Sequence, residues 1–103
     1  MIVRAGGDSE TVVKDLGATP AEILRQLTPL MQRYRVVGGA SWPAFALAGG
    51  GRVLVSVEAG PERRIGGLTL PSSRVTLRFY GARQHEQARF VADFSRVTQR
   101  GGG

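Results

Sequence analysis

Few residues in this chain are of a type that performs covalent chemistry. Its 103 residues include no cysteine and a single histidine, His85. Without cysteine there is no thiolate nucleophile, no disulfide and no sulfur ligand for a metal. As a general base, His85 would need a nucleophile and an orienting carboxylate brought to it by the fold. Its place beside Gln84 and Glu86 favours a solvated histidine on a helix surface instead.

The segment around Ser41 is the nearest approach to a nucleophile motif. Gly39–Pro43 reads Gly-Ala-Ser-Trp-Pro, whereas a nucleophile elbow requires Gly-x-Ser-x-Gly on a turn from a strand to a helix. Here Pro43 occupies the last glycine position, and a strand is expected to follow. We therefore do not expect a nucleophilic serine.

Carboxylates and glycines are also arranged without a recognisable cofactor motif. Asp8, Glu10 and Asp15 could share a loop, but no histidine and no spaced aspartate pattern accompanies them. The only metal site that these carboxylates leave possible is one that binds a hard cation through oxygen ligands. No glycine-rich phosphate loop occurs. The sequence thus predicts no catalytic residue, no cofactor and no metal.

The charge of the chain is strongly basic and unevenly distributed. Its formal net charge is +6, most of which belongs to residues 61–103. Such a balance attracts polyanions. No apolar run is long enough to span a membrane, and the first residues lack the apolar segment of a secretory signal. We expect a cytoplasmic protein.

One helix start is well marked. Thr19 can cap a helix, Pro20 suits its first position, and Glu22 completes a capping box. Pro29 is expected to break the helix near Thr28. The apolar stripe of this segment is formed by Ile23, Leu24, Leu27, Leu30, Met31 and Tyr34.

The rest of the chain predicts a sheet and a closing helix. Residues 2–5 and 11–14 are short β-prone runs. From residue 44 the apolar period is two, which predicts strands at 44–48, 52–58, 65–70 and 74–80 in a four-stranded antiparallel meander, with a β-bulge at Gly66–Gly67. Residues 82–99 form the closing helix, whose inner stripe is Phe90, Val91, Phe94 and Val97. Asp93 and Arg96 lie three residues apart and are expected to pair on its surface.

The predicted fold is an α+β two-layer sandwich of order β-α-β-β-β-β-α, with two helices covering one face of the sheet. Residues 1–100 form a single domain, and Gly101–Gly103 a frayed tail. An exposed Gly-Gly end is shared with ubiquitin-like proteins, but their tail follows a strand, whereas this one follows a helix. We therefore do not expect conjugation through the tail.

The residues of the uncovered sheet face form the one group that suggests a function. It is expected to present Arg74, Thr76, Arg78 and Tyr80, joined by Arg52 and Arg64 from neighbouring strands. Arginines with an interleaved ring could bind single-stranded nucleic acid. Beside small residues, they also suit a protein interface. Trp42 precedes the first strand of the meander, where it would either anchor a partner or cover the end of the core.

The leading hypothesis is a non-enzymatic binding or adaptor module that acts through protein–protein contacts, with self-association as a homodimer included. Its candidate interface is Arg52, Arg64, Arg74, Arg78, Tyr80 and Trp42. A weak nucleic-acid-binding domain that uses the basic sheet face is the alternative. A further alternative is a small-ligand pocket between helix and sheet.

Overall fold

The computed structural model describes residues 2–4, 9–38 and 42–98, and it confirms the predicted α+β class. Asp8, Ser41 and the glycine tail lie outside these residues. The elements follow in the order β1 (Ile2–Arg4), β2 (Ser9–Leu16), α1 (Pro20–Gln26), α2 (Thr28–Arg33), β3 (Arg35–Gly38), β4 (Ala44–Ala46), β5 (Arg52–Ala59), β6 (Arg63–Ile65), β7 (Leu68–Leu70), β8 (Ser73–Tyr80) and α3 (Gln84–Thr98).

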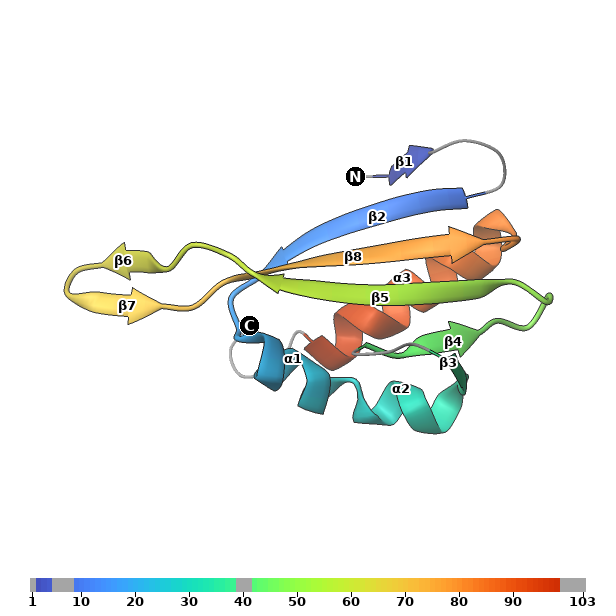
Figure 1. Cartoon of the computed structure of the whole chain (residues 1–103), viewed down its shortest axis with the longest axis horizontal. Coiled ribbons are helices and arrows are strands. Elements are labelled where there is room, and N and C mark those ends of the chain that lie inside the picture. The colour runs from blue at the N-terminus through green and yellow to red at the C-terminus, as the bar shows by residue number, and fades with distance from the viewer. Residues whose placement is uncertain (1, 5–8, 39–41, 99–103) are drawn as a thin grey trace.

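Six strands form one antiparallel sheet of order β1-β2-β8-β5-β4-β3 (Figure 1). The centre of the sheet is β8, which pairs with both β2 and β5. Each pairing runs over eight consecutive residues without a register shift. Because the side-chain period of a strand is two, this register fixes which residues of the three long strands share a face.

The predicted meander is wrong in one respect, because the segment expected as its third strand leaves the sheet. Residues 63–70 form the hairpin β6–β7, which projects beyond β5 and β8 (Figure 1) and which we call the arm. Gly66 and Gly67 have φ values of +57° and +101° and make a two-residue turn, not a bulge. Positive φ at both positions matches the turn that joins tightly paired antiparallel strands. The sheet also includes β3, which was not predicted.

The first helix begins and breaks where the sequence predicts. The Thr19 hydroxyl accepts a hydrogen bond from the Glu22 N–H at 3.1 Å, and the Glu22 carboxylate accepts one from the Thr19 N–H at 2.8 Å. Leu27 separates α1 from α2, and Pro29 lies in the first turn of α2. The missing N–H of proline is tolerated at that position because no intrahelical acceptor is available there.

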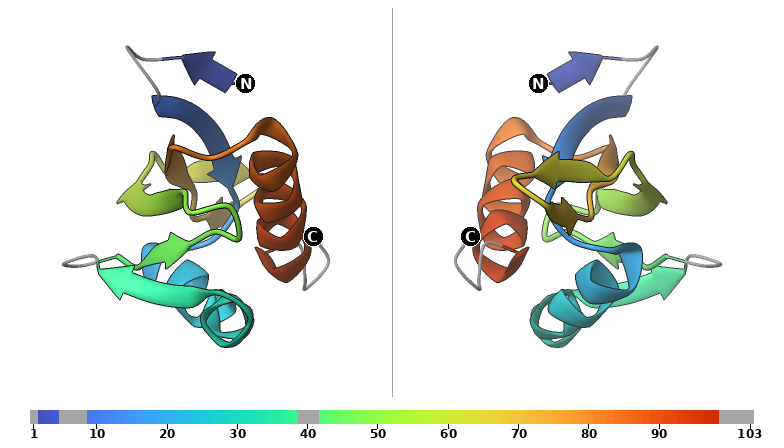
Figure 2. Two further views of the ribbon diagram at one scale, coloured as in Figure 1. Left: turned by 90° about the vertical axis from the view of Figure 1, so that its right-hand side faces the viewer. Right: turned by 90° about the vertical axis from the view of Figure 1, so that its left-hand side faces the viewer.

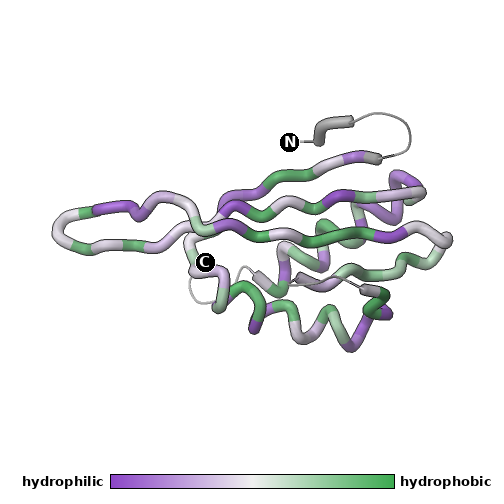
Figure 3. Tube along the Cα trace, in the orientation of Figure 1, coloured by the Kyte–Doolittle hydropathy of each residue, from purple (hydrophilic) through white to green (hydrophobic). Residues whose placement is uncertain are grey.

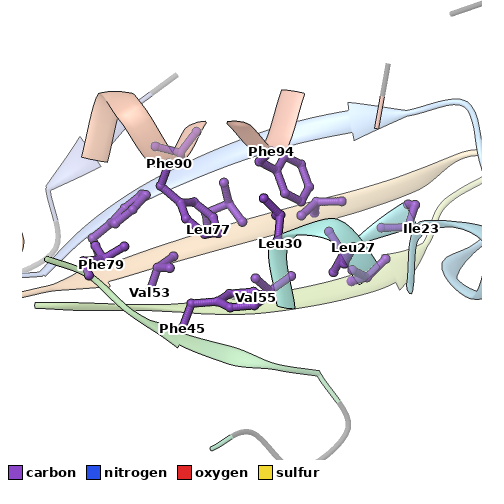
Figure 4. Packing of buried hydrophobic residues seen from close by; sticks show 14 residues of the cluster. Ile23, Leu27, Leu30, Phe45, Val53, Val55, Leu77, Phe79, Phe90 and Phe94 are labelled. Carbon is purple, nitrogen blue, oxygen red and sulfur yellow. The ribbon is translucent and has the colours of Figure 1, made fainter. Parts of the chain in front are cut away.

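All three helices cover the same face of the sheet (Figure 2). Figure 4 shows apolar side chains of the helical segments meeting those of β5 and β8. The fully buried members include Ile23, Leu27, Phe45, Val53, Val75, Leu77, Phe79, Phe90 and Phe94. Apolar and polar residues alternate along β5 and β8 (Figure 3), which leaves the other face of the sheet uncovered.

The arm carries the most exposed large apolar side chains of the described residues. Ile65 is 60% exposed and Leu68 66%. The hairpin register pairs these two residues and places Arg64 opposite Thr69, on the other face of the arm. Within the residues that the structure describes, no helix is long and apolar enough to cross a membrane.

Candidate functional site

The uncovered face of the sheet contains most of the residues that the sequence predicted as an interface. We define the open face as the outward side chains of β5 and β8, namely Arg52, Leu54, Ser56, Glu58, Arg74, Thr76, Arg78 and Tyr80. The register sets these residues in four rows across the two strands: Arg52 beside Tyr80, Leu54 beside Arg78, Ser56 beside Thr76, and Glu58 beside Arg74.

Two arginines of the open face already have partners. The Arg52 guanidinium lies over the Tyr80 ring, 5.5 Å from its centroid, and cation–π attraction holds it there. Arg74 Nε donates to Asp15 Oδ1 at 3.2 Å, across the pairing of β8 with β2. Both partners of this ion pair are more than half exposed, so the pair adds little stability.

Two predicted interface residues lie elsewhere. Arg64 belongs to the arm and does not join the open face, because the chain leaves the sheet after β5. Trp42 is partly buried and packs against the hydrophobic core, as expected of a residue that covers the end of the core. The structure therefore brings together Arg52, Arg74, Arg78 and Tyr80.

Positive and negative side chains of the open face lie toward opposite ends of its strands. One end carries Arg52 and Arg78 with no carboxylate in their two rows. At the other end, Glu58 and Asp15 flank Arg74 on neighbouring strands. The small residues Ser56 and Thr76 form the row between Leu54–Arg78 and Glu58–Arg74. A basic end and a weakly acidic end on one surface allow that surface to complement itself.

A second cluster, centred on Asp93, was missed by the sequence analysis. Asp93 was expected on the helix surface paired with Arg96, and that ion pair is confirmed at 3.2 Å. However, Asp93 is only 4% exposed, so its predicted surface position is wrong. Its Oδ1 also accepts from Arg33 Nη1 at 3.1 Å, and its Oδ2 accepts from the Tyr34 hydroxyl at 2.6 Å.

The position of Asp93 between two core phenylalanines contained the signal that was missed. Phe90 and Phe94 are fully buried on the inner stripe of α3, and residues three apart on a helix share a face. A carboxylate on that stripe requires partners within the fold, and Tyr34 and Arg33 provide them from the end of α2.

These contacts displace the pKa values of both acids. Burial alone would raise the pKa of Asp93, but hydrogen bonds from Tyr34 and Arg33 and the charges of Arg33 and Arg96 lower it below its ordinary value. Burial, together with the hydrogen bond to Asp93, raises the pKa of Tyr34 to about 12. The cluster therefore keeps a carboxylate charged and a phenol protonated.

The ionisation of Tyr34 can be measured directly. Tyr34 and Tyr80 are the two tyrosines of the chain, so the Y80F variant leaves Tyr34 as the only phenol. Absorbance at 295 nm of folded Y80F should then titrate with a pKa of about 12. Adding D93N removes the negative charge beside the phenol and should lower this pKa. A pKa near the ordinary value of about 10 in Y80F itself would contradict the geometry.

The described part of the chain holds no cluster of metal-ligating side chains. His85 is exposed at the start of α3, and no group of three histidine or acidic residues there could hold a metal ion. The open face itself presents guanidinium groups, the half-buried ring of Tyr80 and small polar side chains. Neither protein-family models, nor curated proteins, nor solved structures provide a match to this chain.

Proposed function

We propose that this chain is a non-enzymatic interaction module whose open face binds protein, and that its first partner is a second copy of itself. The observation that supports the proposal is the charge polarity of the open face. Arg52 and Glu58 lie at opposite ends of one strand, on the side that no helix covers. Arg and Tyr are also enriched where protein interfaces have their strongest contacts.

A two-fold axis that runs across the strands makes this surface self-complementary. Such an axis lays β5 of one copy over β5 of the other in the reverse direction. The Arg52 row of each copy then faces the Glu58 row of its partner, so that opposite charges meet twice. A two-fold axis along the strands would instead place the Arg52 rows against one another. Electrostatics therefore selects the first arrangement.

The centre of the open face permits close approach of two sheets. Ser56 and Thr76 form one of its two central rows, and Leu54, which is 38% exposed, lies in the other beside Arg78. Face-to-face sheets pack about 10 Å apart through interdigitating side chains. Apart from Arg78, the side chains in the middle are small or apolar and charges lie at both ends, as in an interface with an apolar centre and a polar rim.

A charge exchange tests this arrangement. R52E places a carboxylate opposite Glu58, and E58R places a guanidinium opposite Arg52. Each change occurs twice in the dimer, and like charges face to face cost several kcal/mol. In sedimentation equilibrium, each single variant should dissociate at least about 30-fold more readily than the wild type. The double variant R52E/E58R restores opposite pairs and should recover most of the affinity.

R83E is the matched control, because Arg83 is exposed in the loop before α3 and lies off the open face. It should dimerise like the wild type. A wild type that remains monomeric at millimolar concentration would overturn self-association. A double variant no stronger than either single variant would overturn the proposed pairing of Arg52 with Glu58.

Single-stranded nucleic acid is the second candidate occupant of the open face. Arg52, Arg78 and Tyr80 at the basic end favour it, since arginines bind phosphates and rings stack on bases. The Arg52 guanidinium already lies over the Tyr80 ring, however, so a base would have to displace it or use the opposite side of the ring. Binding of a fluorescent oligonucleotide that weakens steeply with salt and is lost in R78E would establish this candidate.

A further inference from the structure

A basic groove lies on the helix side of the molecule, away from the open face. It runs between α3 and the segment that joins α2 to β3, and its volume is about 890 Å³. Arg33, Arg89 and Arg96 are among its lining residues, and Ala46, Leu47 and Ala48 form a small, mostly apolar part of its wall. Sites for small molecules typically have volumes of about 300–1,000 Å³ and combine an apolar wall with a few polar groups.

Asp93 holds two of these arginines in place. Arg33 Nη1 donates a hydrogen bond to Asp93 Oδ1 at 3.1 Å, and Arg96 Nη1 forms an ion pair with the same oxygen at 3.2 Å, while the Tyr34 hydroxyl donates to Oδ2. The Arg33 and Arg96 side chains are still 59% and 67% exposed. Because each guanidinium has five N–H donors, most of their donors remain free to bind a ligand in the groove.

Arg89 adds a third cation that Asp93 does not hold. It lies one turn before Asp93 on α3, is exposed, and makes no ion pair with the described residues. It is close enough to Tyr34 for its charge to act on the phenol. The groove lining contains four arginines against the carboxylates of Glu86 and Asp93, and a concave surface concentrates such a positive field.

We propose that this groove binds a small molecule through its phosphate group. Guanidinium forks match the oxygens of a phosphate and bind it with paired, charge-assisted hydrogen bonds. The Ala46–Ala48 wall then accommodates the uncharged part of the ligand. Asp93 is a positioning residue in this account, since it orients Arg33 and Arg96. With two hydrogen-bond donors and the Arg96 guanidinium beside it, Asp93 repels an anion less than a free carboxylate would.

Calorimetry at constant ionic strength tests the site, with pyrophosphate, AMP and sulfate as probes. Pyrophosphate and AMP should both bind, and tighter binding of AMP would show that the apolar wall is used. Replacing a charged donor typically weakens binding about tenfold or more, which is the effect expected of R89Q. E86Q removes a negative charge from the groove lining and should tighten binding.

R83Q is the matched control, because it removes the same charge outside both the groove and the open face. It should change the dissociation constant by less than about twofold. Equal weakening by R89Q and R83Q, or equal binding of sulfate and the two phosphate probes, would show unspecific attraction and overturn the site. Absence of heat with all probes, confirmed by an unchanged melting temperature, would also overturn it. None of these results depends on whether R52E dissociates the dimer.

Discussion

Replacing Asp93 with alanine should lower the free energy of unfolding by about 2–3 kcal/mol. The carboxylate accepts hydrogen bonds from Arg33 and Tyr34 and forms a second ion pair with Arg96, while being only 4% exposed itself. The substitution removes all three interactions together. It also leaves the partly buried Tyr34 hydroxyl without its acceptor, and an unsatisfied buried donor is the larger part of the loss.

The size of the effect follows from which partners can return to water. Breaking a fully buried ion pair costs about 3–5 kcal/mol because a buried charge stays behind. Here the side chains of Arg33 and Arg96 are 59% and 67% exposed, so both are resolvated when Asp93 is removed. For the same reason R96A alone should cost less than about 1 kcal/mol.

Urea unfolding of D93A, D93N and R96A measures how much unfolding free energy each variant loses. D93N keeps an amide oxygen that can accept from Tyr34, so its loss should be smaller than that of D93A. Equal stability of D93A and wild type would mean that the three contacts to Asp93 contribute nothing. An R96A variant as unstable as D93A would assign the stabilisation to the exposed ion pair instead.

Acid should weaken the stabilisation that Asp93 provides. Because the pKa of Asp93 is lower in the folded chain than in the unfolded one, the unfolded chain binds the proton first. The stabilisation is therefore complete above the unfolded value of about 3.9 and is lost as the pH falls through the folded value. The difference in unfolding free energy between wild type and D93N should shrink below about pH 4.

Local sequence signals predicted the elements whose boundaries depend on neighbouring residues. The Thr19–Glu22 capping box and the break before Pro29 both involve groups within one helical turn, and both lie where predicted. The alternation along residues 74–80 likewise placed Arg74, Arg78 and Tyr80 on the face opposite the helices. Each of these features is determined by local geometry and burial, which a pattern can express.

Features that depend on pairing between distant segments could not be predicted in this way. The residues around Gly66–Gly67 fit a hairpin turn as well as a bulge within one strand. The pairing of β8 with β5 and β2 decides between the two, because it leaves residues 63–70 outside the sheet. All four residues of β3 are exposed, so no alternation marks that strand. Asp93 was read as a surface partner of Arg96 because its contacts with Tyr34 and Arg33 span about sixty residues.

Phe90 connects the core to the Asp93 cluster, and F90A should be the most destabilising of the substitutions considered. Its ring is fully buried and lies 5.1 Å from the Tyr34 ring, 5.5 Å from the Phe45 ring and 6.0 Å from the Phe79 ring, measured between centroids. Removing a buried phenylalanine costs about 3–5 kcal/mol through lost burial and the cavity that remains. That loss is a large part of the roughly 5–15 kcal/mol by which a folded domain is stable.

Thermal and urea unfolding of F90A, F90L and L68A separate this effect from a general loss of apolar surface. F90L fills most of the cavity and should lose only about 1–2 kcal/mol, so it remains measurable if F90A does not fold. Leu68 on the arm is 66% exposed, and L68A should stay within about 0.5 kcal/mol of the wild type. A loss in L68A equal to that in F90L would mean that the arm is packed in solution, whereas a neutral F90L would contradict the ring cluster around Phe90. Tyr34 packs on Phe90 and binds Asp93, so the two sites share a partner. The double variant F90A/D93A should therefore lose less unfolding free energy than the sum of the two single losses.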